Sequence, residues 1–479
     1  MSRFLFVTAL ATLAACRGPS PVIDVEATGG ASGASGNPAA GGSAGGGGAS
    51  GEGGALAGTG GSSGTGGSSG AGGSSGTGGS SGAGGSSSAG GSSSAGGSSG
   101  TGGSGGPSHW VGTWTGAPQL TETANLPPAP LANSALRQLV HVSLGGAQIR
   151  VRFSNEFGDG PLTINQSHAA VCNVTPVSSV IDTTTDTPIT FSGQSSITIA
   201  QGTAAWSDPL VFNLAALSNL AITTAFGAVP ANVTGHPGSR TTSYEQIGSG
   251  NVSAANMTSA MTADHWYVLS GVDVMAPAAA KGLAILGDSI TDGRGSTTNG
   301  NDRWPDDLAR RLMANAPTSR VAVMNQGIGG NAVTAGGLGP TAASRYGRDI
   351  LGQSGVRWVI VFEGVNDLGA GVSASAITSV FATMISQAHA QSFLIYGATV
   401  TPFGANAYYS PAHETERQAV NAYVKSGAFD GYIDFDAAVS DGANPPKLKA
   451  AYDSGDGLHL TPAGYQKMAD TIDLALMTR

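Results

Sequence analysis

The stretch LAILGDSITDG, residues 283–293, runs an apolar segment directly into Gly287, Asp288 and Ser289. An apolar run without alternation is typical of a strand that is buried on both faces of a parallel sheet. A glycine, a carboxylate and a hydroxyl are not what a core position selects. The stretch therefore predicts a buried strand whose end forms part of a functional site.

The rest of the C-terminal half repeats this alternation of strands and helices. Strand-like apolar runs occur at 282–286, 321–325, 358–362, 393–400 and 431–435. Helical stretches lie near 302–314, 341–352, 373–391, 410–426 and 461–477. Runs rich in Val, Ile and Leu, each followed by a helix, predict a parallel sheet covered on both faces. We place this doubly wound α/β domain at 277–479.

The ends of the predicted strands carry the polar residues of this domain. In a doubly wound sheet, ligands bind beyond the carboxyl ends of the strands. Besides GDS, the loops that follow the strands are QGIGGN at 326–331, EGVND at 363–367 and YDSGDGLH at 452–459. A hydroxyl, a glycine-rich loop, an amide and an Asp/His pair would meet at one edge. These are the parts of a serine hydrolase.

These loops resemble the four signature blocks of the SGNH (GDSL-type) hydrolases, in the family's order. The matching strings are GDSIT, NQGIGGN, GVND and DGLH. The resemblance implies a flavodoxin-like sheet with Ser289 as nucleophile, His459 as base and Asp456 as the partner of that base. It also implies an oxyanion hole made by the backbone N–H groups of Ser289 and Gly330 and the side-chain amide of Asn366.

Physical chemistry accounts for these residue types. A serine hydroxyl is a weak nucleophile until a base takes its proton, so Ser289 needs a histidine within hydrogen-bond reach. Asp456 can fix the tautomer of His459 from three residues away, and Asp453 is a rival for that role that needs a tighter loop. Loss of one oxyanion donor typically slows such reactions by roughly 10²- to 10³-fold.

Four neighbouring residues have plainer interpretations. We expect Asp288 to be structural, with hydrogen bonds inside its own loop, and Asp367 to be a solvated loop charge or a helix cap. Asn331 stands where many members of the family have Asp, at a position that is not catalytic. We interpret His413 as a surface or packed residue, with the border of the substrate cleft as the alternative.

Longer strings narrow the resemblance. Three strings resemble those of an extracellular subgroup described as related to a xylan-degradation esterase. They are EGVND, YDSGDGLHLTPAGY and, at the start of the preceding region, WVGTWTGAP. This implies hydrolysis of short acyl esters, acetyl above all, on an acylated polysaccharide or a small ester. The alternatives are a lipase, lysophospholipase or thioesterase with the same residues, and a non-catalytic carbohydrate-binding protein on a hydrolase fold.

Residues 108–276 carry a different pattern. Apolar and polar residues alternate with period two, as at 149–154, and turn sequences such as FGDGP and FSGQSS recur about every 8 to 12 residues. Short strands at this spacing predict an antiparallel β-sandwich. This region would bind glycan or form one wall of the active-site cleft.

The N-terminal segment predicts export and attachment to a membrane. Residues 1–15 read as an export signal, and LAAC at 13–16 resembles the lipobox of bacterial lipoproteins, which implies that Cys16 is acylated. Residues 16–107 are rich in Gly and Ser, which predicts a disordered linker with a reach of roughly 50 Å. We therefore expect a lipid-anchored protein of the bacterial cell envelope, at the outer membrane or cell surface. Ordinary cleavage after Ala11, giving a secreted protein, is the alternative.

Composition excludes several other classes of protein. The formal net charge is −9, from 21 basic and 30 acidic residues, and no basic run is present, which argues against nucleic-acid binding. No His/Cys spacing suits zinc and no dinucleotide fingerprint occurs, so we expect neither a metal nor another cofactor. The second cysteine, Cys172, is expected to be a buried apolar residue.

Overall fold

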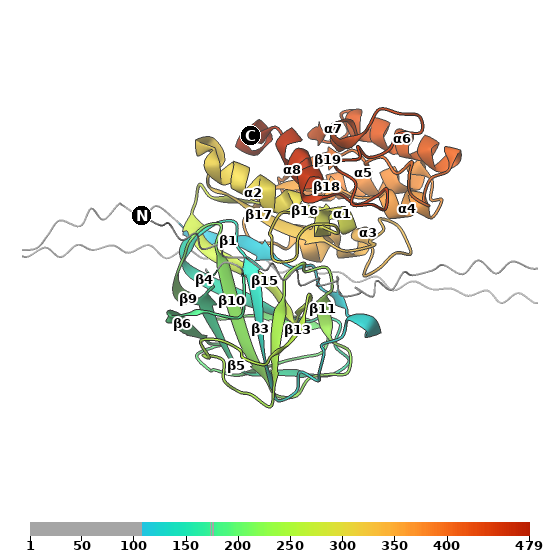
Figure 1. Cartoon of the computed structure of the whole chain (residues 1–479). Coiled ribbons are helices and arrows are strands. Elements are labelled where there is room, and N and C mark those ends of the chain that lie inside the picture. Colours follow the sequence, from blue (N-terminus) through green and yellow to red (C-terminus); the bar gives the residue numbers. More distant parts are fainter. Residues whose placement is uncertain (1–107, 173, 175–176) are drawn as a thin grey trace, which may run out of the picture. The chain divides into compact units, whose positions relative to one another are not determined.

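The computed structural model describes residues 108–172, 174 and 177–479 (Figure 1). The predicted export signal, Cys16 and the Gly/Ser-rich linker lie outside these residues. The described residues all belong to one compact unit. Within it, a β-rich region up to residue 277 precedes an α/β region that begins at residue 281.

The β-rich region contains two large antiparallel sheets and a small one. The first has the order β1 (Ser108–Thr115), β15 (Leu269–Pro277), β4 (Gly146–Asn155), β8 (Thr203–Trp206), with β9 (Leu210–Leu214) also paired to β4. The second runs β13 (Met261–Ala263), β12 (Ser243–Ile247), β3 (Ser134–His141), β10 (Asn219–Phe226), β5 (Leu162–Val171), β6 (Asp182–Ile189), with β7 (Ile197–Ile199) on β5. The small sheet comprises β14 (Trp266–Tyr267), β11 (Thr234–His236) and β2 (Gln119–Leu120).

The two large sheets share one hydrophobic core. Val151 and Val272 of the first sheet and Val140 and Ile222 of the second belong to the same cluster of buried side chains. Along β4, Ile149, Val151 and Phe153 are buried, and Arg150 and Arg152 between them are half-buried, which is the alternation seen in the sequence. Cys172 is fully buried next to the second sheet, as expected.

The α/β region is built on a five-stranded parallel sheet. Its order is β17 (Val321–Gly327), β16 (Lys281–Gly287), β18 (Val356–Phe362), β19 (Leu394–Ala398), β20 (Gly431–Ile433). The second strand along the chain therefore lies outside the first, which is the flavodoxin-like order, with its switch point between β16 and β18. The predicted parallel sheet is confirmed, and each predicted run coincides with one of these strands.

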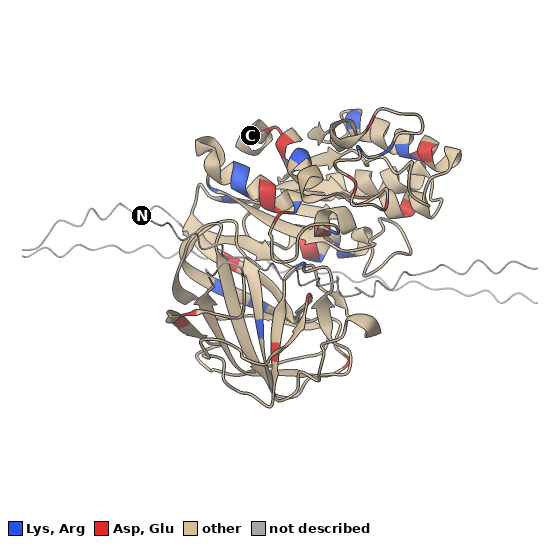
Figure 2. Cartoon of the chain, viewed as in Figure 1, with Lys and Arg blue, Asp and Glu red and all other residues tan. Residues whose placement is uncertain are grey.

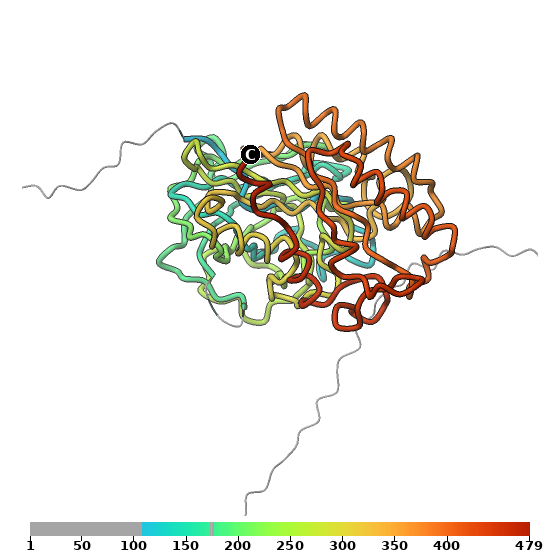
Figure 3. Tube along the Cα trace, turned by 90° about the horizontal axis from the view of Figure 1, so that it is seen from above, coloured from blue at the N-terminus to red at the C-terminus, as the bar shows by residue number. Residues whose placement is uncertain are grey.

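Eight α-helices accompany this sheet in the described residues. They are α1 (Ser289–Asp292), α2 (Trp304–Ala314), α3 (Ala342–Tyr346), α4 (Val365–Gly369), α5 (Ala374–Ala390), α6 (Pro411–Lys425), α7 (Phe435–Val439) and α8 (Pro462–Thr471). The described residues also form the 3₁₀ turns η1 (Thr123–Asn125), η2 (Ala316–Thr318) and η4 (Leu474–Thr478) and the π-turn η3 (Gly347–Leu351). Helix α8 packs on α2, so the C-terminal segment lies beside residues from the start of the domain (Figure 3).

Two predicted helices are shorter than expected. The stretch 341–352 is a one-turn α-helix that continues as a π-turn, η3. The stretch 461–477 breaks after Thr471 and resumes as the 3₁₀ turn η4. Tyr346, Ile350, Met468 and Leu476 of these stretches are buried, so packing rather than helical propensity decides where each element ends.

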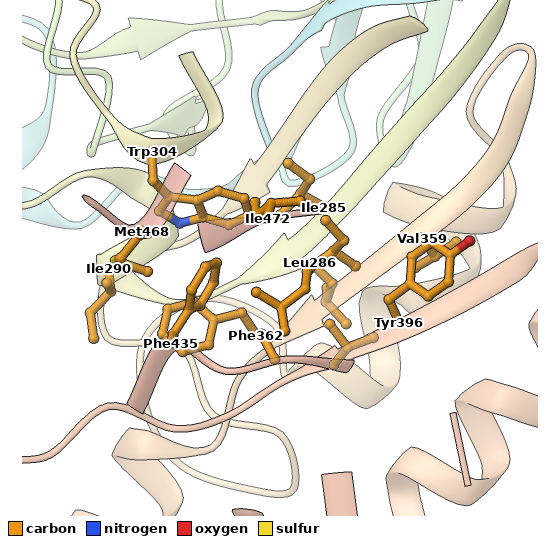
Figure 4. Close-up of a cluster of buried hydrophobic side chains, with 14 of the residues drawn as sticks. Ile285, Leu286, Ile290, Trp304, Val359, Phe362, Tyr396, Phe435, Met468 and Ile472 are labelled. Atoms are coloured by element: carbon orange, nitrogen blue, oxygen red, sulfur yellow. The ribbon is translucent and has the colours of Figure 1, made fainter. Parts of the chain in front are cut away.

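Aromatic side chains fill the core beside β16. The ring of Phe435 lies 5.3 Å from that of Trp304 and 5.1 Å from that of Phe362, in edge-to-face arrangements (Figure 4). Ile285 and Leu286 of β16 belong to the same buried cluster. The strand that leads to Ser289 is therefore held rigidly by its surroundings.

The β-rich region covers the edge strand of the parallel sheet. Ser143 Oγ accepts the N–H of Val323 at 2.9 Å, and Thr115 Oγ1 donates to the carbonyl of Asn325 at 3.0 Å. Both partners lie on β17, the outermost strand on that side. An uncovered edge strand leaves backbone N–H and C=O groups without partners. The β-rich region supplies side-chain partners for two such groups of β17.

Charged residues of both signs are interspersed over the two regions (Figure 2). Among the residues that the structure describes, no helix combines the length and the apolar character needed to cross a membrane.

Candidate active site

Ser289 is presented at a tight junction between strand and helix. It is the first residue of α1, and only Asp288 separates it from the end of β16. Asp288 caps this helix, because its Oδ1 accepts the N–H of Ile290 at 2.8 Å, in line with the structural role expected for it. A Cβ at Gly287 would lie 2.0 Å from Oγ1 of Thr291, so the close turn requires glycine.

Ser289, His459 and Asp456 form a continuous relay. The Ser289 Oγ lies 2.8 Å from Nε2 of His459, and the Nδ1 of that ring lies 2.6 Å from Oδ2 of Asp456. The other carboxylate oxygen of Asp456 accepts the N–H groups of Leu458 at 3.0 Å and of His459 at 2.9 Å. Residues 170 positions apart in the sequence therefore meet with hydrogen-bond geometry.

The state of Asp456 fixes the direction of this relay. Partial burial opposes ionisation of Asp456, but hydrogen bonds from the ring and the backbone of His459 outweigh it and hold the pKa of the carboxyl well below its usual range. An ionised carboxylate only accepts hydrogen bonds, so Nδ1 of His459 carries the proton. Nε2 is then free to accept the hydroxyl proton of Ser289.

Asp453, the rival partner of His459, has another task. Its Oδ1 accepts the N–H groups of Gly455 at 2.8 Å and of Gly457 at 3.0 Å. It shapes the turn that brings Asp456 to the histidine. The structure therefore pairs His459 with Asp456 and not with Asp453.

The three predicted oxyanion donors each have a hydrogen that remains available. Within the described residues, the backbone N–H groups of Ser289 and Gly330 have no protein acceptor. Gly330 has φ of 68°, in the left-handed region that favours glycine. The Nδ2 of Asn366, in the first turn of α4, donates to the carbonyl of Asn331 at 2.7 Å, which leaves its second hydrogen available.

Asn331 organises the loop that carries Gly330. Its Nδ2 donates to the carbonyls of Leu338 and Pro340, both at 2.8 Å, and its Oδ1 accepts from Nε of Arg345 at 3.0 Å. An aspartate at this position would have no donors for the two carbonyls. The asparagine is therefore the residue that this particular loop requires.

A buried arginine ties the ends of two strands together under the site. Arg345 is fully buried and donates to the carbonyls of Gln326 at 2.7 Å and Gly287 at 3.0 Å. It also lies 3.3 Å from the carboxylates of Glu363 and Asp349. Burial raises the pKa of Glu363 well above its ordinary value, although Arg345 opposes this. No sequence motif predicted a role for Arg345 in the site.

The interpretation of Asp367 as a solvated loop charge or a helix cap is wrong. The side chain is completely buried and accepts the N–H groups of Val333 at 2.7 Å and Thr334 at 3.0 Å. It also accepts the hydroxyl of Thr334 at 2.8 Å. Asp367 thus anchors the loop after Gly330 to the helix that carries Asn366, because a buried carboxylate needs such donors.

The β-rich region contributes a residue that the sequence did not indicate. His236, at the end of β11, places Nε2 at 2.9 Å from Oδ1 of Asp292 in α1. Nothing in the local sequence distinguishes this histidine from the others. Among the residues that the structure describes, no group of three or more His, Cys, Asp or Glu side chains could hold a metal ion.

A hydroxyl, an imidazole and an ionised carboxylate joined in line by hydrogen bonds form the relay of a serine hydrolase. Residues 285–467 match the GDSL-like Lipase/Acylhydrolase family. This part of the chain is a domain of that family, and the protein is a serine hydrolase that acts on ester bonds. No curated protein matches the chain.

Solved structures similar to this chain include a GDSL-like lipase from Bacteroides thetaiotaomicron, with 19% identity and a TM-score of 0.33. That alignment covers 41% of this chain and 88% of the lipase. A variant of an acetyl xylan esterase from Geobacillus stearothermophilus has 21% identity and a TM-score of 0.33, covering 40% of this chain and 92% of the esterase.

Proposed function

We propose that this protein is a serine esterase that removes short acyl groups, acetyl above all, from acylated polysaccharide or small esters. The observation that carries the proposal is the relay from Ser289 through His459 to Asp456, with distances of 2.8 and 2.6 Å. It supplies a nucleophile, a base and an orienting carboxylate within hydrogen-bond reach of one another.

The proposed reaction begins with attack of the Ser289 oxygen on the ester carbonyl carbon. His459 Nε2 takes the hydroxyl proton as the C–O bond forms, and Asp456 stabilises the resulting imidazolium. The carbonyl oxygen becomes an oxyanion that the N–H groups of Ser289 and Gly330 and the Nδ2 of Asn366 stabilise.

Collapse of this intermediate breaks the bond to the alcohol. His459 returns its proton to the departing alcohol oxygen, and the acyl group remains on Ser289. Water then attacks the acyl-enzyme with His459 again as base, and a second tetrahedral intermediate releases the carboxylic acid and restores the Ser289 hydroxyl.

The surroundings of the site support a short acyl group. Leu338 is one of the large apolar residues that are exposed in the described part of the chain. Its backbone N–H donates to the carbonyl of Gly330, a residue of the proposed oxyanion hole, at 2.9 Å. A long acyl chain is bound by a continuous apolar surface that removes it from water. A single exposed leucine provides enough apolar contact for a small acyl group but not for a long chain.

A panel of p-nitrophenyl esters from acetate to palmitate, measured beside acetylated xylan, tests the proposal. We expect kcat/KM to be highest for acetate, with acetate released from the polymer. A maximum at long chains would favour a lipase or lysophospholipase, and preference for thioesters a thioesterase. Binding of the polymer without turnover would favour a carbohydrate-binding protein.

We also propose that the enzyme acts outside the cytoplasm, attached to the cell envelope through acylated Cys16. The LAAC sequence at 13–16 and the following Gly/Ser-rich segment support this proposal, because an anchor and a spacer belong together in function. A single acyl chain gives only marginal attachment, so several acyl chains on the modified cysteine are needed for stable anchoring.

A further inference from the structure

One loop contacts both halves of the catalytic machinery. Residues 399–410, which we call the 399–410 loop, connect β19 to α6. Within it, the Tyr408 hydroxyl donates to Oδ1 of Asn366 at 3.0 Å, and Nδ2 of Asn406 donates to the backbone carbonyl of Asp456 at 2.8 Å. The first contact reaches the oxyanion hole and the second reaches the loop of the histidine.

Tyr408, together with the carbonyl of Asn331, holds the Asn366 amide in one orientation. The two ends of a carboxamide have almost the same shape, so its orientation depends on its hydrogen-bond partners. Tyr408 donates to Oδ1 while the carbonyl of Asn331 accepts from Nδ2. With the amide held by both contacts, the second N–H of Nδ2 stays available for the oxyanion. A flipped amide would present an oxygen there and repel the developing charge.

The hydroxyl of Tyr408 is suited to remain a donor. Burial raises the pKa of Tyr408, and the nearby Asp288 raises it further, against the effect of Arg294. The hydroxyl therefore keeps its proton throughout the range in which esterases work. The ring packs closely on α4, since a Cβ at Gly369 would lie 2.4 Å from it, so the ring cannot move away from Asn366 easily.

Asn406 joins Tyr408 to the loop of the triad. Besides donating to Asp456, it accepts the N–H of Tyr408 on Oδ1 at 2.9 Å. A Cβ at Gly457 would lie 2.7 Å from the backbone of Ala405, which shows how closely the two loops approach. The 399–410 loop is itself held by His413, whose Nδ1 lies 2.7 Å from the carbonyl of Tyr408.

We propose that Tyr408 is a positioning residue that fixes the Asn366 amide for oxyanion stabilisation, and that Asn406 couples this contact to the loop of Asp456. The inference rests on the proposed esterase function and adds to it two residues outside the four signature loops. Because Tyr408 acts on the transition state through Asn366, its loss should lower kcat and leave KM nearly unchanged.

The test compares Tyr408→Phe with Tyr409→Phe. Both changes remove one phenolic hydroxyl from the same loop, but the hydroxyl of Tyr409 has no hydrogen-bond partner among the described residues. With p-nitrophenyl acetate, we expect Tyr408→Phe to lower kcat by on the order of tenfold, less than loss of a whole oxyanion donor. Tyr409→Phe should stay within about twofold of the wild type. Equal kcat in the two variants would overturn the inference.

A double-mutant cycle separates positioning from general structural damage. In an Asn366→Ala background there is no amide to orient, so adding Tyr408→Phe should change kcat by less than about twofold. Asn406→Ala should lower kcat in both backgrounds, because it also holds the loop of Asp456. The same loss from Tyr408→Phe in both backgrounds would contradict the inference. Lack of ester hydrolysis by the wild type would instead count against the proposed function.

Discussion

His236 of the β-rich region places Nε2 2.9 Å from Oδ1 of Asp292, in the short helix that Ser289 begins. Its Nδ1 faces the carbonyl of Ala117 at 3.0 Å, and its ring stacks on Trp266 with centroids 5.5 Å apart. The imidazole is thus fixed by residues of the β-rich region, and it holds helix α1, which begins at Ser289 in the α/β region. The β-rich region is part of the support of the active site.

We predict that His236→Ala lowers the free energy of unfolding by about 2 to 3 kcal/mol, since it removes the partner of a buried carboxylate. The other oxygen of Asp292 already has no hydrogen-bond partner among the described residues. Urea unfolding of this variant, of Asp292→Ala and of the double variant provides the measurement. The double variant should lose less than the sum of the single losses, and strict additivity would show that the two side chains are not coupled.

The stability of the protein should carry a pH dependence that originates at Asp288. Burial raises the pKa of Asp288 to about 7, with Asp367 and Asp292 adding to this and Arg345 opposing it. A folded-state pKa above the unfolded value gives stability that is complete below about pH 4 and is lost as the pH rises through about 7.

Asp288→Asn removes this titration while keeping an oxygen that can accept the N–H of Ile290. The stability of the wild type relative to Asp288→Asn should therefore be greatest near pH 4 and fall as the pH approaches 8. Urea unfolding at each pH measures the difference, with Asp470→Asn, which removes an exposed carboxylate, as the control. A difference between wild type and Asp288→Asn that does not change with pH would refute the assignment.

Asp456→Asn should lower kcat strongly while leaving KM close to the wild-type value. The amide can present a donor to Nδ1 of His459 and so favour the wrong tautomer, which costs on the order of 10⁴-fold where Asp is fully buried. Here the Asp456 side chain is 39% exposed, so we expect a loss nearer to 10²-fold. Steady-state kinetics on p-nitrophenyl acetate decides, and a kcat within threefold of the wild type would remove Asp456 from the relay.

Local sequence patterns predicted the parts of the fold that depend on burial. Unbroken apolar runs such as those leading to Ser289 can be stable only inside a covered sheet, and the five parallel strands follow from them. The helices α1, α4 and α7 were not predicted, because segments of four or five residues show no period. Their positions depend on caps such as Asp288 and on packing against the sheet.

Site residues could be predicted where they belong to a short sequence motif, as Ser289 and His459 do. Tyr408 and His236 have no such signal, because each acts through a contact with a residue 42 or 56 positions away. Asp367 was misjudged for a related reason. A carboxylate next to a loop is usually solvated, and only the tertiary structure shows the donors of Val333 and Thr334 that allow its burial.

Cys16→Ser should release the enzyme from the membrane without changing its chemistry. If Cys16 is acylated, the wild-type protein partitions into detergent and incorporates labelled palmitate, and the variant does neither. Hydrolysis of a soluble ester should be the same for both, which serves as the control. Detergent partition of Cys16→Ser equal to that of the wild type would contradict the proposed anchor and favour ordinary secretion.

Formation of an acyl-enzyme on Ser289 tests the central claim most directly. The wild type is mixed with p-nitrophenyl acetate, quenched in acid within milliseconds to seconds, digested and analysed by peptide mass spectrometry. We predict an added acetyl group on the peptide that contains Ser289, transient in the wild type and absent from Ser289→Ala, which should also lose turnover while unfolding like the wild type. Acetylation of a different residue, or sustained turnover by Ser289→Ala, would contradict the proposed mechanism.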